Sequence, residues 1–101
     1  MVKHIILWRL KEDLSEEEKK AAKAGIKAGL ESLQGKIPGL LSIRVQTDSL
    51  SSSNADVMLD SSFADEASLR AYAVHPAHVA VASGKVRPYT KNRSCFDFNE
   101  E

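Results

Sequence analysis

The chain has a single cysteine among its 101 residues, so it cannot form an internal disulfide. Without a disulfide framework the sequence fits a reducing compartment, and we predict a cytoplasmic location. Apolar residues never run for the roughly 20 positions that a membrane span needs. The apolar N-terminal stretch also lacks the small-residue cleavage site of a signal peptide, and we expect no membrane partner.

The chain also has no excess of positive or negative charge, because its fourteen Lys and Arg residues balance fourteen Asp and Glu residues. Nucleic-acid binders owe much of their affinity to phosphate neutralisation, so this balance argues against a nucleic-acid partner. The one basic cluster, formed by Arg87, Lys91 and Arg93, is interpreted as a solvated face. Repeats, linkers and glycine-rich phosphate loops are absent, so residues 1–101 are predicted to form one domain.

The first element that the sequence does contain is an apolar strand, VKHIILWRL, over residues 2–10. Strand side chains alternate, so His4, Ile6 and Trp8 share one face while Ile5 and Leu7 share the other. Both faces are apolar, which is typical of a strand that is covered on both sides.

A helix is predicted next, because Ser15 and Glu18 have the spacing of a capping box. An apolar stripe with helical spacing follows, made of Ala22, Ile26, Leu30 and Leu33. Two strands joined by a serine-rich loop come after it. The first alternates Leu41, Ile43 and Val45 with polar residues, and one face of the second carries Ala55, Val57, Leu59 and Phe63.

The segment YAVHPAHVAV, residues 72–81, divides the helical region that follows. Asp65 is the predicted N-cap of a short helix, which turns Leu69, Tyr72 and Ala73 inward. Pro76 ends that helix and begins another, which stops before Pro88. The inward residues of this second helix are predicted to be His78, Val79, Ala82 and Val86.

A final strand is predicted around Cys95, and its neighbours Phe96 and Phe98 indicate a buried thiol. The order of strands and helices then predicts an α+β fold of the ferredoxin-like, split βαβ type, with helices on one face of a four-stranded antiparallel sheet. The opposite face keeps Ile5 and Leu7. Because monomers seldom expose such apolar patches, we predict a homodimer formed through this sheet face.

Three stretches of the chain together resemble the stress-responsive A/B barrel (Dabb) domain family: VKHIILWRLKEDLSEEE, HPAHVAV and SCFDF. The resemblance extends over essentially the whole chain. It implies a ferredoxin-like subunit that forms a dimeric α+β barrel. The family includes plant stress-induced proteins, a plant polyketide cyclase and bacterial members without an assigned activity.

The resemblance to the cyclase also implies a site, because that enzyme works without a cofactor in a cleft between sheet and helices. His4, Tyr72 and His78 match its catalytic positions, and we expect no cofactor here. Val57 and Lys27 replace a histidine and a tyrosine of the cyclase, so its substrate and reaction are not expected. The residues expected to contact a ligand in the cleft are Ile6, Trp8, Val57, Leu69 and Val79.

The residues themselves leave two interpretations of the histidines open. An imidazole with an ordinary pKa of about 6.5 exchanges protons near neutral pH, so His4 and His78 could act on a ligand with the help of Tyr72. Alternatively, these side chains are hydrogen-bonded inside a core and have no substrate. His75, directly before Pro76, is expected at a helix N-cap in either case.

A metal site of His4, His75 and His78 is a third possibility, since three histidines form many catalytic zinc sites. Pro76 interrupts the helical register between His75 and His78, so their rings need not converge, and we predict no metal. The sequence therefore leaves two functions open. One is the binding of a small apolar carbonyl compound with cofactor-free acid–base catalysis of the cyclase or lyase kind; the other is a non-enzymatic, stress-associated structural or ligand-carrier dimer.

Overall fold

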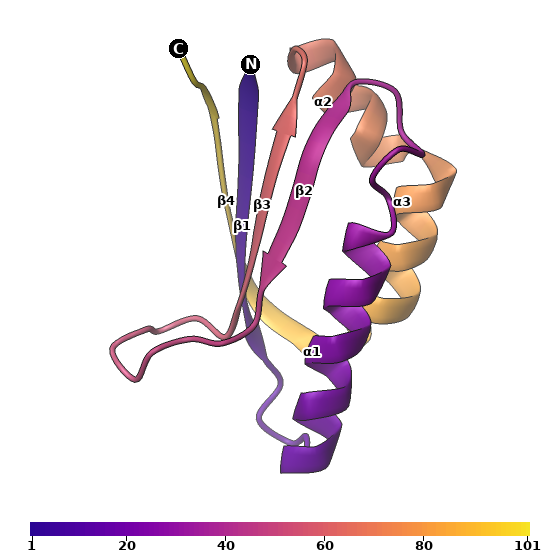
Figure 1. Cartoon of the computed structure of the whole chain (residues 1–101). Helices are drawn as coiled ribbons and strands as arrows, with labels where there is room; N and C mark the ends of the chain where they lie inside the picture. Colours follow the sequence, from indigo (N-terminus) through magenta and orange to yellow (C-terminus); the bar gives the residue numbers. More distant parts are fainter.

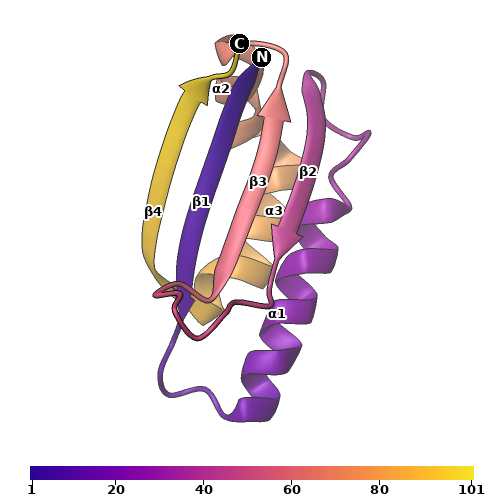
Figure 2. The same cartoon turned by 60° about the vertical axis from the view of Figure 1, so that its left-hand side comes forward.

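The strand β1 (Val2–Leu10) lies inside a four-stranded antiparallel sheet, between β3 (Val57–Phe63) and β4 (Thr90–Asn99). The strand β2 (Leu40–Gln46) completes the sheet on the far side of β3, in the order β2-β3-β1-β4 (Figure 2). The computed structural model describes residues 1–101. The ferredoxin-like arrangement predicted from the sequence is confirmed.

All of the helices lie on one side of this sheet (Figure 1). They are α1 (Glu16–Glu31), α2 (Glu66–Val74) and α3 (Pro76–Val81), and α3 continues into a π-helical turn, Ala82–Val86, and a 3-10 turn, Arg87–Tyr89. The core lies between the sheet and the helices. It includes the predicted stripe of α1, since Ala22, Ile26, Leu30 and Leu33 are all buried.

The alternation of β1 places its even-numbered residues against the helices. His4, Ile6 and Trp8 are buried, whereas Leu7 is 37% exposed and Ile5 is half-buried. This separation confirms the predicted division of the strand into two faces, because residues i and i+2 point to the same side of a sheet.

Side-chain caps begin each of the three helices as predicted. The Ser15 side chain accepts a hydrogen bond from the Glu18 amide, and Glu18 bonds back to the Ser15 amide. Asp65 caps α2 through the Ser68 amide, and the His75 ring caps α3 by accepting from the Ala77 amide. These bonds satisfy amide groups that a helix leaves unpaired at its N-terminus.

Two predictions of inward-facing residues are wrong. A bulge in the pairing of β2 with β3, between Leu40 and Ser42, turns Leu40 into the core and leaves Leu41 52% exposed. Val79 of α3 is 42% exposed, because His78 takes the position that faces the sheet. Pro88 does not end the helix as predicted but lies within the 3-10 turn, where its missing amide is tolerated.

The predicted burial of Cys95 is also wrong, since its side chain is exposed. In β4, Cys95 pairs with Ile6 and Asp97 with His4, so both side chains point toward the helices. Phe96 and Phe98 pair with Ile5 and Lys3, so they lie on the other face. Phe96 is 67% exposed there, and the aromatic residues of β4 therefore face away from the helices.

The sheet face that no helix covers carries Ile5, Leu7, Met58, Phe96 and Phe98, which we call the outer face. The Phe96 and Phe98 rings lie 5.6 Å apart, and Lys3 and Asp60 form an ion pair beside them. Apolar side chains gathered in this way are typical of a surface that contacts a partner. None of the helices combines the length and the apolar character needed to span a bilayer.

Gly39 and Gly35 provide a matched test of the packing between β2 and α2. Both have positive φ angles, +82° and +83°, so alanine costs about 1 kcal/mol of backbone strain at either position. At Gly39 an added Cβ would also lie 2.1 Å from the Ser68 Oγ, whereas at Gly35 it meets no atom within 4 Å. We expect Gly39→Ala to cost about 1–3 kcal/mol more than Gly35→Ala in denaturant unfolding. Equal losses would contradict the close approach of Gly39 to α2.

Candidate functional site

A cavity of about 590 Å³ lies between the sheet and the helices, on the inward side of β1 and β4. It is larger than the hollows of about 360, 280 and 250 Å³ found elsewhere on the surface. Its polar lining consists of His4, Arg70, Tyr72, His78, Arg87, Arg93, Cys95 and Asp97. Apolar residues, Ile6, Trp8, Leu30, Leu59, Leu69, Ala82 and Val86 among them, form the rest of the wall.

Tyr72 of α2 joins the two predicted catalytic histidines. Its ring centroid lies 4.1 Å from that of His78, with an angle of 33° between the planes, and 6.0 Å from that of His4, edge to face. Phe63 packs against the Tyr72 ring from β3 at 4.9 Å. The strand, the end of α2 and the first turn of α3 therefore bring His4, Tyr72 and His78 into one cluster.

The hydroxyl of Tyr72 is buried and has no hydrogen-bond partner in the protein. Burial raises the pKa of Tyr72 to about 12, and the positive charge of Arg93 opposes part of that rise. The phenol therefore keeps its proton at neutral pH and is a donor. A buried hydroxyl without a partner costs free energy, which a ligand with an acceptor oxygen would recover.

His78 has the properties of a proton acceptor. Its Nδ1 lies 3.3 Å from the Ala73 carbonyl oxygen, and since a carbonyl only accepts, Nδ1 carries the proton and Nε2 is left as the acceptor. Burial lowers the pKa of His78 below its ordinary 6.5, in spite of the bond to Ala73, and the charges of Arg87 and Arg93 act in the same direction as burial. The ring is therefore neutral at pH 7.

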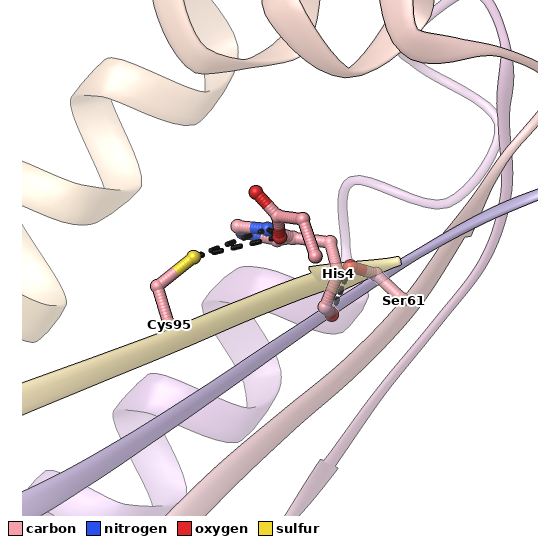
Figure 3. Close-up of polar contacts among 4 residues, drawn as sticks. His4, Ser61 and Cys95 are labelled. Atoms are coloured by element: carbon pink, nitrogen blue, oxygen red, sulfur yellow. Dashed lines mark hydrogen bonds and ion pairs between the residues drawn. The ribbon is translucent and has the colours of Figure 1, made fainter. Parts of the chain in front are cut away.

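His4 is held by Asp97 across the pair of strands β1 and β4. Its Nδ1 donates to the Asp97 carboxylate at 2.5 Å, so Nε2 remains free of this bond. The His4 carbonyl oxygen accepts from the buried Ser61 hydroxyl at 3.0 Å, which fixes the backbone beneath the ring (Figure 3). A carboxylate that orients an imidazole in this way selects its tautomer.

Cys95 lies next to this pair, on the same side of the sheet as His4 (Figure 3). Its thiol donates to the Asp97 carboxylate at 3.4 Å. Partial desolvation by the surrounding protein and the neighbouring Asp97 raise the pKa of the exposed Cys95 thiol, although Arg93 partly opposes them. A protonated thiol is a poor nucleophile, so Cys95 is a hydrogen-bond donor to Asp97.

His4, Cys95 and Asp97 also offer ligand atoms that lie within 4.8 Å of one another. The 2.5 Å separation of His4 Nδ1 and the Asp97 oxygen is that of a direct hydrogen bond. Two ligands of one zinc ion, each bound at about 2 Å, lie farther apart, so metal binding would require this bond to break. The alternative metal site, with His75, does not assemble, because the His75 ring caps α3 and does not line the cavity.

The predicted site residues fall into two groups. His4, Ile6, Trp8, Leu69, Tyr72 and His78 line the cavity. Val57 is buried but does not line the cavity. Val79 is exposed on the surface of α3 and does not line the cavity either. Lys27, the other position that differs from the cyclase, donates to the Val45 carbonyl and pairs with Glu31 instead of reaching the cavity.

Sequence reasoning missed Asp97 and the arginines of the cavity. Arg87 and Arg93, interpreted as part of a solvated face, are exposed but line the cavity. A signal for Asp97 was present in the final strand, where Arg93, Cys95 and Asp97 alternate with Ser94, Phe96 and Phe98. That alternation indicates two faces, one with Arg93, Cys95 and Asp97 and the other with the aromatic residues.

The family model identifies the family of the chain, and the solved structures share its fold. The model of the stress responsive A/B barrel domain, Dabb, matches residues 2–100. A solved dimeric protein of unknown function and ferredoxin-like fold from Bacteroides fragilis is 30% identical, with a TM-score of 0.91 over 98% of this chain and 95% of its own.

Two further solved structures share the fold at lower identity. A Dabb family protein from Mesorhizobium loti is 20% identical, with a TM-score of 0.74 over 99% of this chain and 96% of its own. A hydroxynitrile lyase from Passiflora edulis is 19% identical, with a TM-score of 0.72 over 99% of this chain and 94% of its own. No curated protein matches the sequence.

Two hydroxyl deletions test whether the Tyr72 hydroxyl lacks a partner. Tyr72→Phe removes a buried hydroxyl that makes no bond, so we expect the free energy of unfolding to rise by about 1 kcal/mol. Ser61→Ala removes a buried hydroxyl that donates to the His4 carbonyl, and it is expected to cost about 0.5–1.5 kcal/mol. Denaturant unfolding of both variants decides the point. A loss in Tyr72→Phe as large as that in Ser61→Ala would show that the hydroxyl is bonded.

Proposed function

Because the chain belongs to the stress responsive A/B barrel (Dabb) domain family, we propose that it binds a small, largely apolar carbonyl compound between sheet and helices and acts on it by cofactor-free acid–base catalysis. One observation carries this proposal. The Tyr72 hydroxyl is a protonated, buried donor without a partner, in the wall of a mainly apolar cavity and beside a neutral imidazole.

In the proposed reaction Tyr72 is the electrophilic group. Its O–H donates to the carbonyl oxygen of the ligand, which polarises the carbonyl and stabilises negative charge that develops on that oxygen. The hydroxyl exposes no surface, so the ligand reaches it only after a side chain at the cavity mouth moves. Arg93 is exposed, lines the cavity and carries a positive charge that opposes the rise in the Tyr72 pKa.

His78 is the proposed base. Its neutral Nε2 takes a proton from the carbon next to the carbonyl; the C–H bond breaks, and its electron pair is delocalised onto the carbonyl oxygen as an enolate. Protonated His78 then returns the proton to the same or another atom of the ligand. The lowered pKa of His78 suits this role, because the ring is unprotonated at neutral pH.

His4 and Asp97 complete the site as a hydrogen-bonded pair. Asp97 is a positioning residue, since it holds Nδ1 of His4 and leaves the other ring nitrogen available to a ligand or a water molecule. The solved protein from Passiflora edulis is a hydroxynitrile lyase, so this fold supports at least one lyase. That likeness supports the enzyme interpretation only at the level of the fold.

Binding without chemistry is the second candidate function, that of a small-ligand carrier. The buried Tyr72 hydroxyl also favours this carrier function. Because the hydroxyl exposes no surface, the protein must rearrange before Tyr72 can touch a substrate. A carrier needs the apolar wall of the cavity but not the base, so the two functions differ in their dependence on His78.

The homodimer is part of the proposal. The solved protein from Bacteroides fragilis is dimeric, and the outer face of this chain exposes the apolar residues that such an interface needs. Leu7 and Phe98 are both 37% exposed and Phe96 is 67% exposed, so pairing two outer faces would bury them together.

Exchange of the methyl protons of 2-acetonaphthone in D₂O, followed by proton NMR, tests the catalytic proposal. We expect the protein to accelerate exchange, and His78→Gln and Tyr72→Phe to lower the rate by about 100-fold or to the buffer rate. His75→Asn is the matched control, since asparagine preserves the N-cap of α3 and His75 lies outside the cavity. The rate should fall as the pH drops through the His78 pKa, below 6.5, because the base becomes protonated.

Three outcomes of this experiment are informative. Exchange that survives in His78→Gln, or that is lost equally in His75→Asn, would contradict the assigned base. Saturable binding of 2-acetonaphthone without exchange would support the carrier function. Absence of both binding and exchange would refute the cavity as a site for carbonyl compounds.

Leu7→Lys tests the dimer. Burying an uncompensated charge in the interface is costly, so this variant should sediment as a monomer at micromolar concentration while the wild-type protein sediments as a dimer. Val74→Lys is the control, because Val74 is 75% exposed at the end of α2, on the helical side of the molecule. A wild-type monomer, or a Leu7→Lys variant that stays dimeric, would contradict an interface at the outer face.

A further inference from the structure

The charges that line the cavity are unequal. Three arginines contribute to its wall, Arg70, Arg87 and Arg93, whereas Asp97 is the one carboxylate among the lining residues. The chain as a whole carries no formal net charge, so this excess of positive charge is local. A mainly apolar cavity has no evident structural need for it.

The partners of these groups show which charges remain available. Asp97 is bonded to His4 and Cys95. Arg70 pairs with Glu66 one turn away on α2, at 3.7 Å, and its side chain is 72% exposed. Arg87 and Arg93 form no ion pair with any carboxylate of the chain. The cavity therefore has two guanidinium groups without a counter-charge.

The path of β4 explains why Arg93 faces the cavity and Lys91 does not. Arg93 follows Cys95 and Asp97 on the inward face of the strand. The pairing with β1 then shifts between Leu7 and Arg9, where Asn92 adopts a positive φ of 53°. This bulge places Lys91 opposite Arg9, and Lys91 pairs with Glu12 outside the cavity. A single arginine of β4 is thus directed inward.

The effect of the two arginines extends to the reactive groups. The positive charge of Arg93 acts on the pKa values of Tyr72, His78 and Cys95, and that of Arg87 acts on the pKa of His78. Both arginines also line the same cavity of about 590 Å³ as Tyr72 and His78, so one small molecule in it could contact both sets of groups. Guanidinium groups bind planar carboxylates through two parallel hydrogen bonds.

We infer that the natural ligand of this cavity is a carboxylate-bearing carbonyl compound, a small aliphatic or aromatic oxo acid, whose carboxylate is bound by Arg93 and Arg87 while its carbonyl reaches Tyr72. The inference rests on the proposed function and adds the ligand class. Arg93 and Arg87 are then specificity-determining residues.

Two probes of nearly equal shape test the inference: 2-naphthoate, which is an anion at neutral pH, and 2-acetonaphthone, which is not. Binding is measured by isothermal titration calorimetry at low ionic strength. We expect 2-naphthoate to bind at least about tenfold more tightly, as a charge-assisted hydrogen bond predicts. Added salt should reduce this preference, because it screens the attraction between the exposed arginines and the carboxylate of the probe.

The variants assign the preference to particular residues. Arg93→Gln and Arg87→Gln should each remove most of the preference for 2-naphthoate and leave the affinity for 2-acetonaphthone nearly unchanged. Arg70→Gln is the matched control, because it removes the same charge from a lining residue that is already paired. All three side chains are exposed, so the variants are expected to fold, and far-ultraviolet circular dichroism checks this.

The outcomes separate this inference from the function on which it rests. Equal affinity for the two probes, with 2-acetonaphthone bound, would overturn the carboxylate inference and leave the proposed function standing. A loss of preference in Arg70→Gln as large as in Arg93→Gln would also overturn it. Failure of both probes to bind would overturn both proposals.

Discussion

The two-residue alternation of β1 and β4 is the constraint on which the site and the outer face both depend. Paired residues of neighbouring strands share a face, so the pair His4–Asp97 points to the helices and the pair Ile5–Phe96 points away from them. A shift of one residue in this register would exchange the two sets. The polar cavity and the apolar outer face are therefore two consequences of one strand pairing, and neither can change without the other.

The cavity combines groups that a stable core would avoid. It holds a buried hydroxyl without a partner, a histidine kept neutral by burial, and two guanidinium groups without counter-charges. The buried hydroxyl raises the free energy of the unliganded protein, and a ligand with a carbonyl and a carboxylate would supply partners to both the hydroxyl and the arginines. Groups that are poorly satisfied in the folded chain are expected where structure serves binding or catalysis.

The sequence was most informative where a local rule acts alone. The capping box at Ser15, the N-cap at His75 and the faces of β1 were predicted correctly, because hydrogen-bonding capacity and side-chain alternation decide them. It misled in β4, where Cys95 was expected to be buried beside its aromatic neighbours, although its side chain is exposed and Phe96 lies on the other face of the sheet. The bulges after Leu40 and at Asn92 leave no clear sequence signal, and the unbonded state of the Tyr72 hydroxyl depends on packing that only the folded chain defines.

The proposed function depends on a hydrogen bond that the Tyr72 hydroxyl donates to the carbonyl oxygen of the ligand. Carbon-13 NMR of 2-acetonaphthone labelled at its carbonyl carbon measures that bond directly, since a hydrogen bond polarises the carbonyl and moves its resonance downfield. We expect a downfield shift on binding to the wild-type protein and its loss in Tyr72→Phe, with the probe still bound. The same shift in both proteins, or none in either, would contradict the claim.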